Sequence, residues 1–375
     1  MAIITPEFME LTSNLDLKAF WDENQRCVEF TTQKPRCPVH FSPDDHWLFE
    51  FMAVPSTLRY YQDKTYRDDL HSQVNRITRD YIGLAFFEED TWQYSPRRIE
   101  NLFGCDFEYY EGGTPWFIPV TSDPVEFSQI LDRAEDIDLE TWTFPEEFLT
   151  EWEVRQSAGK IMPLLGTGSR GPATIMTSVL GAETPFYWFY DYPDLMARFR
   201  DILADKMVAL NTLLRNFSKN TQSGWWITDD NCALFNRKLY KGYCFPVLDR
   251  VLNAMAPGDA ARYQHSDSAM GHLLDFQYAL GIREVNYGPE VDTALIRSAM
   301  PDAMINGHLP PFLLCNGSPE DIKARIKDDF QAAGGSGGLT VTTAGSLSAG
   351  TGVGRMRWLM QVVQDHCRYD RLGTP

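Results

Sequence analysis

Residues 224–354 repeat one pattern, in which a short apolar run is followed by a polar or acidic cluster and then by a helical stretch. The runs read WWIT, ARYQ, REVNY, DAMI and GLTVTT. Strands that alternate with helices predict βαβ units and a parallel sheet. A chain of 375 residues is long enough for one (β/α)8 barrel with insertions. We therefore predict an α/β fold, a single TIM barrel preceded by a helical extension.

Ionisable residues follow the ends of these runs. Because the carboxyl ends of barrel strands meet on the face that carries the active site, this placement predicts an enzyme. The candidate catalytic residues are Asp229, Asp230, His265 and Asp267; the polar residues after the next two runs are Glu290, Asn306 and His308. An alternative role for Asp229 or Asp230 is to cap the segment that follows. For His308 the alternative is a rigid surface loop, because Pro310 and Pro311 follow it.

The chain ahead of the repeats is less regular. We predict a helical extension over residues 1–54 and the barrel over residues 55–375. Asp44 or Asp45 is placed to cap a helix over Trp47 to Met52. The alternative is that Asp45 and His46 line the mouth of the active site.

Local signals mark three further elements. A hairpin with Gly112-Gly113 at its turn precedes a helix that Asp123-Pro124 begins in cap-then-proline order. Further on, a strand over Ile161 to Leu165 leads through the loop GTGSRGP into a helix. This loop lacks a Lys-Ser/Thr pair and has only a broken dinucleotide fingerprint, so no nucleotide is expected. Arg170 in the loop is a candidate for pairing with a substrate carboxylate.

Composition narrows the class of partner. With 34 basic and 52 acidic residues the net charge is −18, which argues against a nucleic-acid or anionic-membrane surface. Seven cysteines occur singly and without CxxC spacing, which argues against disulfides and a cysteine zinc site. The N-terminus has no basic stretch ahead of an apolar core, and no apolar run reaches the length of a membrane span. A cytoplasmic protein is expected; a homodimer is compatible with the sequence.

The order of blocks along the chain resembles one superfamily. The blocks are GPATIMTSVLGAE, FYDYPDLMARFRDILADKM, WWITDDNCALFNRKLYKGYCFPVLDRVLNAM, HSDSAMGHLLDFQYALGIREVNYGPEVD, AMINGHLPPFLLCNGSPEDIKARIKD and the last glycine-rich loop. Over about residues 155–370 they are similar to the uroporphyrinogen decarboxylase superfamily. That superfamily comprises the decarboxylases of haem synthesis and zinc-dependent methyltransferases that exchange methyl groups with corrinoid proteins. The resemblance implies a (β/α)8 barrel.

The chain departs from both branches of that superfamily. The arginine-rich glycine motif with which the decarboxylases hold substrate carboxylates has no equivalent here. Where the methyltransferases have a His-x-Cys pair, this chain has His265-Ser266-Asp267, and its loop at Ala344-Gly345-Ser346 has no thiol. Zinc bound by thiolates is thus excluded at these positions. The hard donors that remain suit zinc or another divalent ion, and the predicted metal ligands are His265, Asp267, Glu290 and His308.

The resemblance and the donor set together imply a methyltransferase. Its expected substrate is a small methoxylated or methylated compound, and its expected acceptor is a separate corrinoid protein. The residues leave two alternatives open: a decarboxylase or lyase that acts on a carboxylated substrate by metal or acid/base chemistry, and a barrel that binds a ligand without catalysis. The glycine-rich loop over residues 344–354 with Arg355 is a candidate anion site. The expected substrate-binding residues are Arg170, Asn306 and Arg355.

Overall fold

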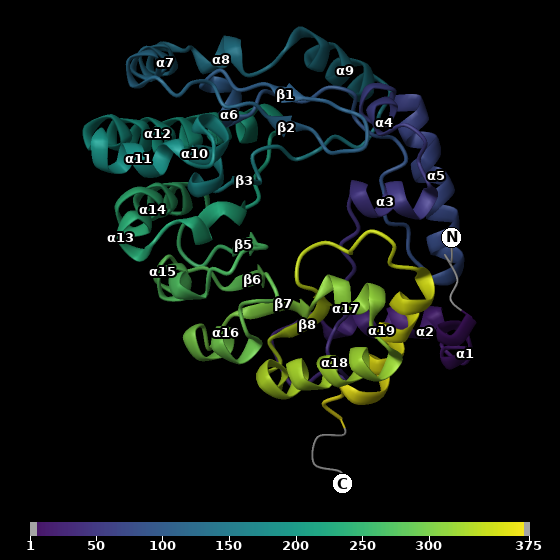
Figure 1. Ribbon diagram of the computed structural model, residues 1–375. Helices are drawn as coiled ribbons and strands as arrows, with labels where there is room; N and C mark the ends of the chain where they lie inside the picture. Colours follow the sequence, from purple (N-terminus) through teal and green to yellow (C-terminus); the bar gives the residue numbers. More distant parts are fainter. Residues whose placement is uncertain (1–5, 371–375) are drawn as a thin grey trace.

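Six short strands lie side by side in one parallel sheet, in the order in which they occur along the chain (Figure 1). The structure is a computed structural model and describes residues 6–370. The strands are β3 (Gly168–Arg170), β4 (Trp225–Thr228), β5 (Arg262–Ser266), β6 (Glu284–Tyr287), β7 (Met304–Leu309) and β8 (Leu339–Thr343). They curve around one side of a common centre, with the barrel helices outside them, and α3 (Asp45–Met52) and α5 (Lys64–Tyr81) lie on the other side of that centre (Figure 1). The predicted α/β barrel architecture is confirmed.

Alternation along each strand separates the core from the barrel interior. In β8, Leu339 and Val341 are buried against the helical layer, whereas Thr340 and Thr342 line the interior. In β6, Val285 is buried in the same way and Glu284 lines the interior. Successive side chains of a strand point to opposite faces. The apolar core therefore lies between the strands and the helices, and the interior is polar.

The helices that cover the sheet follow the strands in turn. Within them, α12 packs on α14, and α18 packs on both α16 and α19. The barrel helices are α10 (Pro172–Leu180), α11 (Thr184–Asp191), α12 (Pro193–Ser218), α13 (Arg237–Leu239), α14 (Phe245–Met255), α15 (Leu274–Ala279), α16 (Thr293–Ala299), α17 (Pro311–Asn316), α18 (Pro319–Ala333) and α19 (Val353–His366). Among residues 6–370, no helix combines the length and the apolar character that crossing a membrane requires.

The N-terminal half contributes short helices and one hairpin. The hairpin pairs β1 (Phe107–Glu108) with β2 (Trp116–Phe117) in antiparallel register, as the Gly112-Gly113 turn predicts. The helices are α1 (Pro6–Leu11), α2 (Leu17–Asn24), α3 (Asp45–Met52), α4 (Thr57–Gln62), α5 (Lys64–Tyr81), α6 (Ile99–Leu102), α7 (Pro124–Asp136), α8 (Leu139–Trp142) and α9 (Glu146–Ser157). Asp44 caps α3 through Trp47, and Asp123 caps α7. Both caps agree with the sequence analysis.

The strand predicted over residues 161–165 is wrong. Ile161 is 96% exposed, so this apolar run has no surface to pack on. The strand forms a few residues later, as β3, and pairs with β4. At Gly168 any Cβ would lie 2.0 Å from the Trp226 ring. Only glycine allows β3 to approach β4 this closely, which the apolar pattern does not reveal.

An extended segment over residues 37–41 joins the free edge of β8. The backbone N–H of His40 donates to the Val341 carbonyl (3.1 Å), and Val341 N–H donates to the Pro38 carbonyl (2.8 Å). On its other side, Val39 hydrogen-bonds through both backbone groups to the Asn24 amide (2.8 and 3.0 Å). The segment thus extends the sheet beyond β8, and the Asn24 side chain forms the hydrogen bonds that a further strand would form with Val39. The predicted boundary between the helical extension and the barrel, at residues 54 and 55, stays a prediction. Residues 37–41 of that extension pair directly with β8.

A second side chain supports the neighbouring segment. Asn75 of α5 accepts from the backbone N–H groups of Phe86 and Phe87 (2.8 and 3.0 Å) and donates to the Phe87 carbonyl (2.7 Å). The Phe86 ring lies 6.1 Å from that of Phe41. Within the described residues, no strand ladder connects this region to β3. Asn75 therefore satisfies backbone groups that a regular barrel would satisfy by strand pairing.

We expect Asn75→Ala to lower the free energy of unfolding by about 2–4 kcal/mol, because it leaves three backbone groups unpaired around a fully buried site. Ser72→Ala, an exposed change on the same helix, is the control and should alter stability by less than about 0.5 kcal/mol. Urea denaturation followed by circular dichroism measures both. Equal stability of the two variants would contradict the role assigned to Asn75.

Candidate active site

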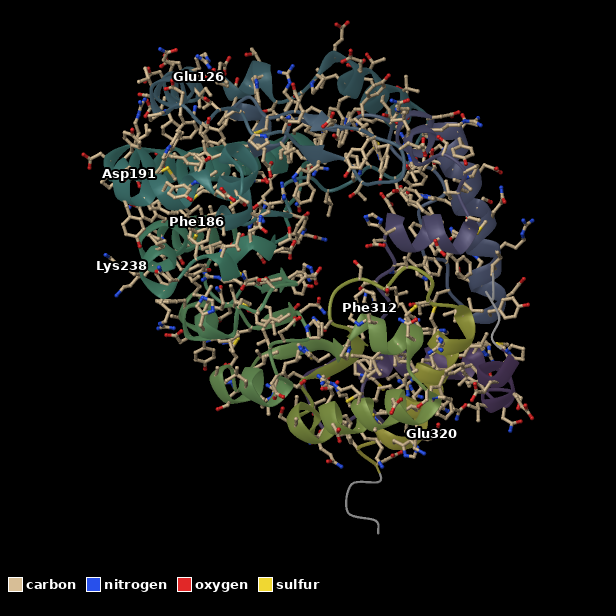
Figure 2. All side chains as sticks on the ribbon, in the orientation of Figure 1. Glu126, Phe186, Asp191, Lys238, Phe312 and Glu320 are labelled. Carbon is tan, nitrogen blue, oxygen red and sulfur yellow. The ribbon has the colours of Figure 1, made fainter. Side chains whose placement is uncertain are left out.

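A cavity of about 700 Å³ occupies the interior of the barrel. Its lining includes residues from five strands, β4 to β8, and Gly345 and Ser346 from the loop after β8. Ser42, which follows the segment over residues 37–41, also lines it. Charged side chains such as Glu126, Asp191 and Lys238 lie on the outer rim, while the centre between β5 and α3 stays open in this view (Figure 2). The lining is Asn24, Val28, Pro38, Val39, His40, Ser42, Thr228, Tyr263, His265, Glu284, Asn286, Met304, Asn306, Thr340, Thr342, Gly345 and Ser346. It contains neither lysine nor arginine.

His265, near the carboxyl end of β5, is held by a single amide. Its Nδ1 lies 2.8 Å from Oδ1 of Asn286, and that oxygen also accepts from Gly345 N–H (3.0 Å). The Asn286 nitrogen donates to the carbonyls of Thr343 (3.0 Å) and Asn306. These partners fix the orientation of the amide, so Nδ1 of His265 must be the donor. The Nε2 atom is thereby presented to the mouth of the cavity.

Two carboxylates face this nitrogen. Nε2 of His265 lies 3.4 Å from Oδ1 of Asp267 and 3.6 Å from Oδ1 of Asp230. The backbone N–H of Asp267 donates to Asp230 Oδ1 (3.0 Å), which fixes the two acids relative to each other. One donor atom from each of the three residues lies within 4.8 Å of the others. Asp230, His265 and Asp267 form the candidate site.

The glycine-rich loop shapes this site through Gly345. Its φ of +95° is a backbone conformation that favours glycine, and a Cβ there would lie 2.3 Å from Asp267 Oδ1. Behind Asp267, a Cβ at Gly288 would lie 2.3 Å from its backbone oxygen. Asp267 is therefore positioned between two glycines, with Gly345 against its carboxylate and Gly288 against its backbone carbonyl.

The environment of His265 favours a positive charge at Nε2. Burial of the ring opposes protonation, but the carboxylates of Asp267 and Asp230 and the amide of Asn286 outweigh it, so the pKa of His265 is raised. A divalent cation at the same position would benefit from the same two carboxylates. The site is thus suited to a proton or to a metal ion on Nε2.

The donor distances fit a divalent ion. They are longer than the roughly 2.7–2.9 Å of a charge-assisted hydrogen bond. They are close to the separation of about 3.4 Å between two ligands of a tetrahedral ion that each lie about 2.1 Å from it. One imidazole and two carboxylates suit zinc in a catalytic site or a harder divalent ion. No cysteine belongs to this group among the described residues.

The structure changes the predicted ligand set. Asp230 joins His265 and Asp267, whereas Glu290 and His308 lie outside the group of donors. Glu290 is exposed in the loop after β6. His308 is only 1% exposed and faces the charged residues of α18, including Asp329, and burial lowers the pKa of its ring.

Both predicted arginines bind other parts of the protein. Arg170 pairs with the buried carboxylate of Glu100 (3.0 Å). Arg355 donates to the carbonyls of Leu314 (3.0 Å) and Gly317 (2.7 Å), at the end of α17. Asn306, the third expected substrate-binding residue, lines the cavity. The structure therefore brings only Asn306 of these three together with the cluster.

Asp229, the remaining catalytic candidate, faces away from the cavity. It is fully buried, and its Oδ1 accepts from the backbone N–H of Thr174 (2.8 Å) in the first turn of α10. Its other carboxylate oxygen has no partner among the described residues. Burial raises the pKa of Asp229 to about 7, despite the hydrogen bond from Thr174. Asp229, just after β4, thus caps the N-terminus of α10, which follows β3.

Asp45 belongs to a separate hydrogen-bonded group, in which the hydroxyls of Tyr60 and Tyr61 donate to it (2.9 and 3.2 Å). Neither Asp45 nor His46 lines the cavity. The sequence analysis missed Asn286 and Glu284. Their alternation with buried Val285 and Tyr287 was the available signal, because alternate residues of a strand share a face.

The arrangement defines an α/β barrel with a hard-donor site at the carboxyl ends of its strands. A family model described as uroporphyrinogen decarboxylase (URO-D) matches residues 98–366, so the chain belongs to this family. The match begins well before the stretch whose blocks carry the resemblance, and it confirms that resemblance.

Among solved structures, the chain is similar to a methyltransferase from Methanosarcina mazei, with a TM-score of 0.58 and 14% sequence identity. The similarity covers 92% of this chain and 98% of that chain. At this identity the likeness shows the fold alone. A comparison with curated proteins finds no match.

Asp229 makes the pH dependence of stability testable. Its pKa in the folded protein lies above the ordinary 3.8, so the group stabilises the fold at low pH, and this contribution is lost as the pH rises through about 7. Asp229→Asn keeps an oxygen for Thr174 and cannot ionise. We expect it to flatten the decline in unfolding free energy between about pH 4 and pH 8, an effect on the order of a few kcal/mol.

Denaturation at a series of pH values measures this effect, and Asp80→Asn, on the exposed side of α5, is the control. A slope in Asp229→Asn equal to that of the wild type would show that Asp229 is ionised throughout.

Proposed function

We propose that this chain is a methyltransferase that demethylates a small methoxylated or methylated compound and passes the methyl group to a separate corrinoid protein. The observation that carries the proposal is the cluster of Asp230, His265 and Asp267 at the mouth of a cavity without lysine or arginine. Membership of the URO-D family makes methyl transfer and decarboxylation the two chemistries to compare.

The charges in the cavity favour methyl transfer. A decarboxylase that acts on a substrate with several carboxylates needs cationic side chains to hold them, and arginine is suited to this role. Here Arg170 is paired with Glu100, and Arg355 donates to backbone carbonyls. The interior instead contains the carboxylate of Glu284. Polyanionic substrates would be repelled.

In the proposed reaction, His265, Asp230 and Asp267 would hold a divalent ion, and Asn286 keeps Nε2 of His265 directed toward its place. When bound, such an ion would polarise an oxygen or nitrogen of the substrate. The methyl group leaves without the electron pair of its bond, and the pair stays on the oxygen or nitrogen. The partner's corrinoid supplies the nucleophile that accepts the methyl group.

A second candidate is an acid/base lyase, and the raised pKa of His265 is the observation in its favour. In that reaction a protonated Nε2, held by Asp230 and Asp267, would deliver a proton to the product. The two candidates use the same nitrogen in different ways. Metal content therefore separates them.

The metal content of the purified protein tests the proposal. We expect about one divalent ion per chain in the wild type and its loss in His265→Ala, since the imidazole is one of three donors. His46→Ala, which removes an exposed histidine outside the cavity, should retain the ion. If neither the wild type nor the control holds metal, the acid/base lyase is favoured, and decarboxylation becomes the first activity to assay.

Two exposed acids distinguish the structural ligand set from the predicted one. Asp267→Ala should abolish metal binding and methyl transfer and leave the thermal unfolding temperature within a few degrees, because its side chain is 57% exposed. Glu290→Ala should leave both properties unchanged. The assay follows methyl transfer from methoxylated compounds to a reduced corrinoid protein. Loss of metal in Glu290→Ala instead would restore the ligand set predicted from sequence.

A further inference from the structure

The cavity contains one carboxylate that the proposed chemistry does not use. Glu284 is the first residue of β6 and lines the interior, whereas Asp230 and Asp267 lie beyond the strand ends. Among the described residues its carboxylate forms no hydrogen bond or ion pair, and it is solvent-exposed. A carboxylate that lines a cavity without a partner attracts positive charge.

Next to this carboxylate lies an aromatic ring. In the sheet register Tyr263 of β5 is directly opposite Glu284, and Met304 of β7 lies opposite it on the other side. All three side chains line the cavity. The face of an aromatic ring attracts cations by the same electrostatics as a carboxylate, only more weakly. Glu284 and Tyr263 therefore form one electronegative stretch of wall.

No positive group offsets it. Burial lowers the pKa of His40, the second histidine of the lining, which favours the neutral form of its ring. Any positive charge at His265 is compensated by the two carboxylates that face it. The charge of Glu284 thus remains without a counter-charge, in a chain whose net charge is −18.

The wall also holds a side-chain amide without a partner. Asn306 of β7 lines the cavity, and its side-chain amide forms no hydrogen bond among the described residues. This half-buried amide offers a donor and an acceptor to a ligand. A ligand for this cavity therefore needs a polar group of its own as well as a positive charge.

We propose that the cavity binds a small methylated ammonium ion that also bears a hydroxyl or carbonyl group. The Glu284 carboxylate and the Tyr263 ring take the charged end, and polar groups such as the Asn306 amide take the other. This inference rests on the proposed function, for which it names the class of substrate. A quaternary nitrogen has no lone pair for a divalent ion, so the ion would meet the hydroxyl or carbonyl oxygen of such a compound. When the ammonium gives up a methyl group, the bonding pair stays on nitrogen as the lone pair of a neutral amine.

Two probes of nearly equal shape test the charge requirement. Choline and 3,3-dimethyl-1-butanol differ in one atom, nitrogen against carbon, and therefore in charge. We expect calorimetry to show choline binding at least about tenfold more tightly to the wild-type protein. Equal affinity for the two probes would overturn the proposal. So would tighter binding of 3-methoxybenzoate, an anionic methoxylated compound.

A matched pair of variants assigns the charge to Glu284. Glu284→Gln should reduce the preference for choline over its neutral analogue by about tenfold, whereas Asp259→Asn, which removes an exposed carboxylate just before β5, should not. Thermal unfolding checks that both variants are folded. A preference that survives in Glu284→Gln would overturn the role of this residue.

The outcomes separate the inference from the proposed function, because binding is measured without a corrinoid protein. Choline that binds, but does not transfer a methyl group to any reduced corrinoid, would count against the proposed function and leave the cation site intact. Methyl transfer from neutral methoxylated compounds alone, with no binding of choline, would support the proposed function and overturn the cation site.

Discussion

The amide of Asn286 is the interaction on which the arrangement of the site depends. It donates to carbonyls of β7 and of the end of β8, and it accepts from Gly345 N–H and from the imidazole of His265. One buried side chain thereby connects two strands, the glycine-rich loop and the candidate ligand. An amide inside a protein is costly unless all its groups are paired, and here each is paired. The same hydrogen bonds that fix Asn286 also decide which nitrogen of His265 faces Asp230 and Asp267.

One side of the barrel is built by regular strand pairing, and on the other side amide side chains pair with the backbone groups instead. From β3 to β8 the strands satisfy one another, whereas the segment over residues 37–41 depends on the Asn24 amide, and Phe86 and Phe87 depend on Asn75. A barrel interior is ordinarily filled with bulky side chains. In this chain the inward positions of β8 are threonines, and those of β6 are Glu284 and Asn286. Small and polar inward residues leave the central cavity open.

Acidic side chains gather at the mouth of the cavity, and no lysine or arginine lines its wall. Arg170 and Arg355, which the sequence offered for binding an anionic substrate, are instead paired with Glu100 and with backbone carbonyls. The carboxylates at the mouth face a histidine, and Glu284 inside the barrel faces none. Under the proposed function, this distribution favours a substrate of neutral or positive charge. A metal ion at the mouth would cancel the charge of Asp230 and Asp267 and leave that of Glu284.

The sequence by itself determined the features that depend on neighbours along the chain. The alternation in residues 224–354 specified the strands and the barrel, and Asp44 and Asp123 specified the starts of two helices. The positions of His265 near the end of one strand and of Asp267 just after it placed both residues at the carboxyl face of the barrel. Only the tertiary structure decided which of two adjacent acids faces the site. Asp229 continues the outward face of β4 and caps α10, whereas the backbone turns at Asp230 into a short 3-10 helix and directs it toward His265. Glycine packing at Gly168 and Gly345, and the contacts of Asn286, join residues far apart in sequence, so no local pattern reports them.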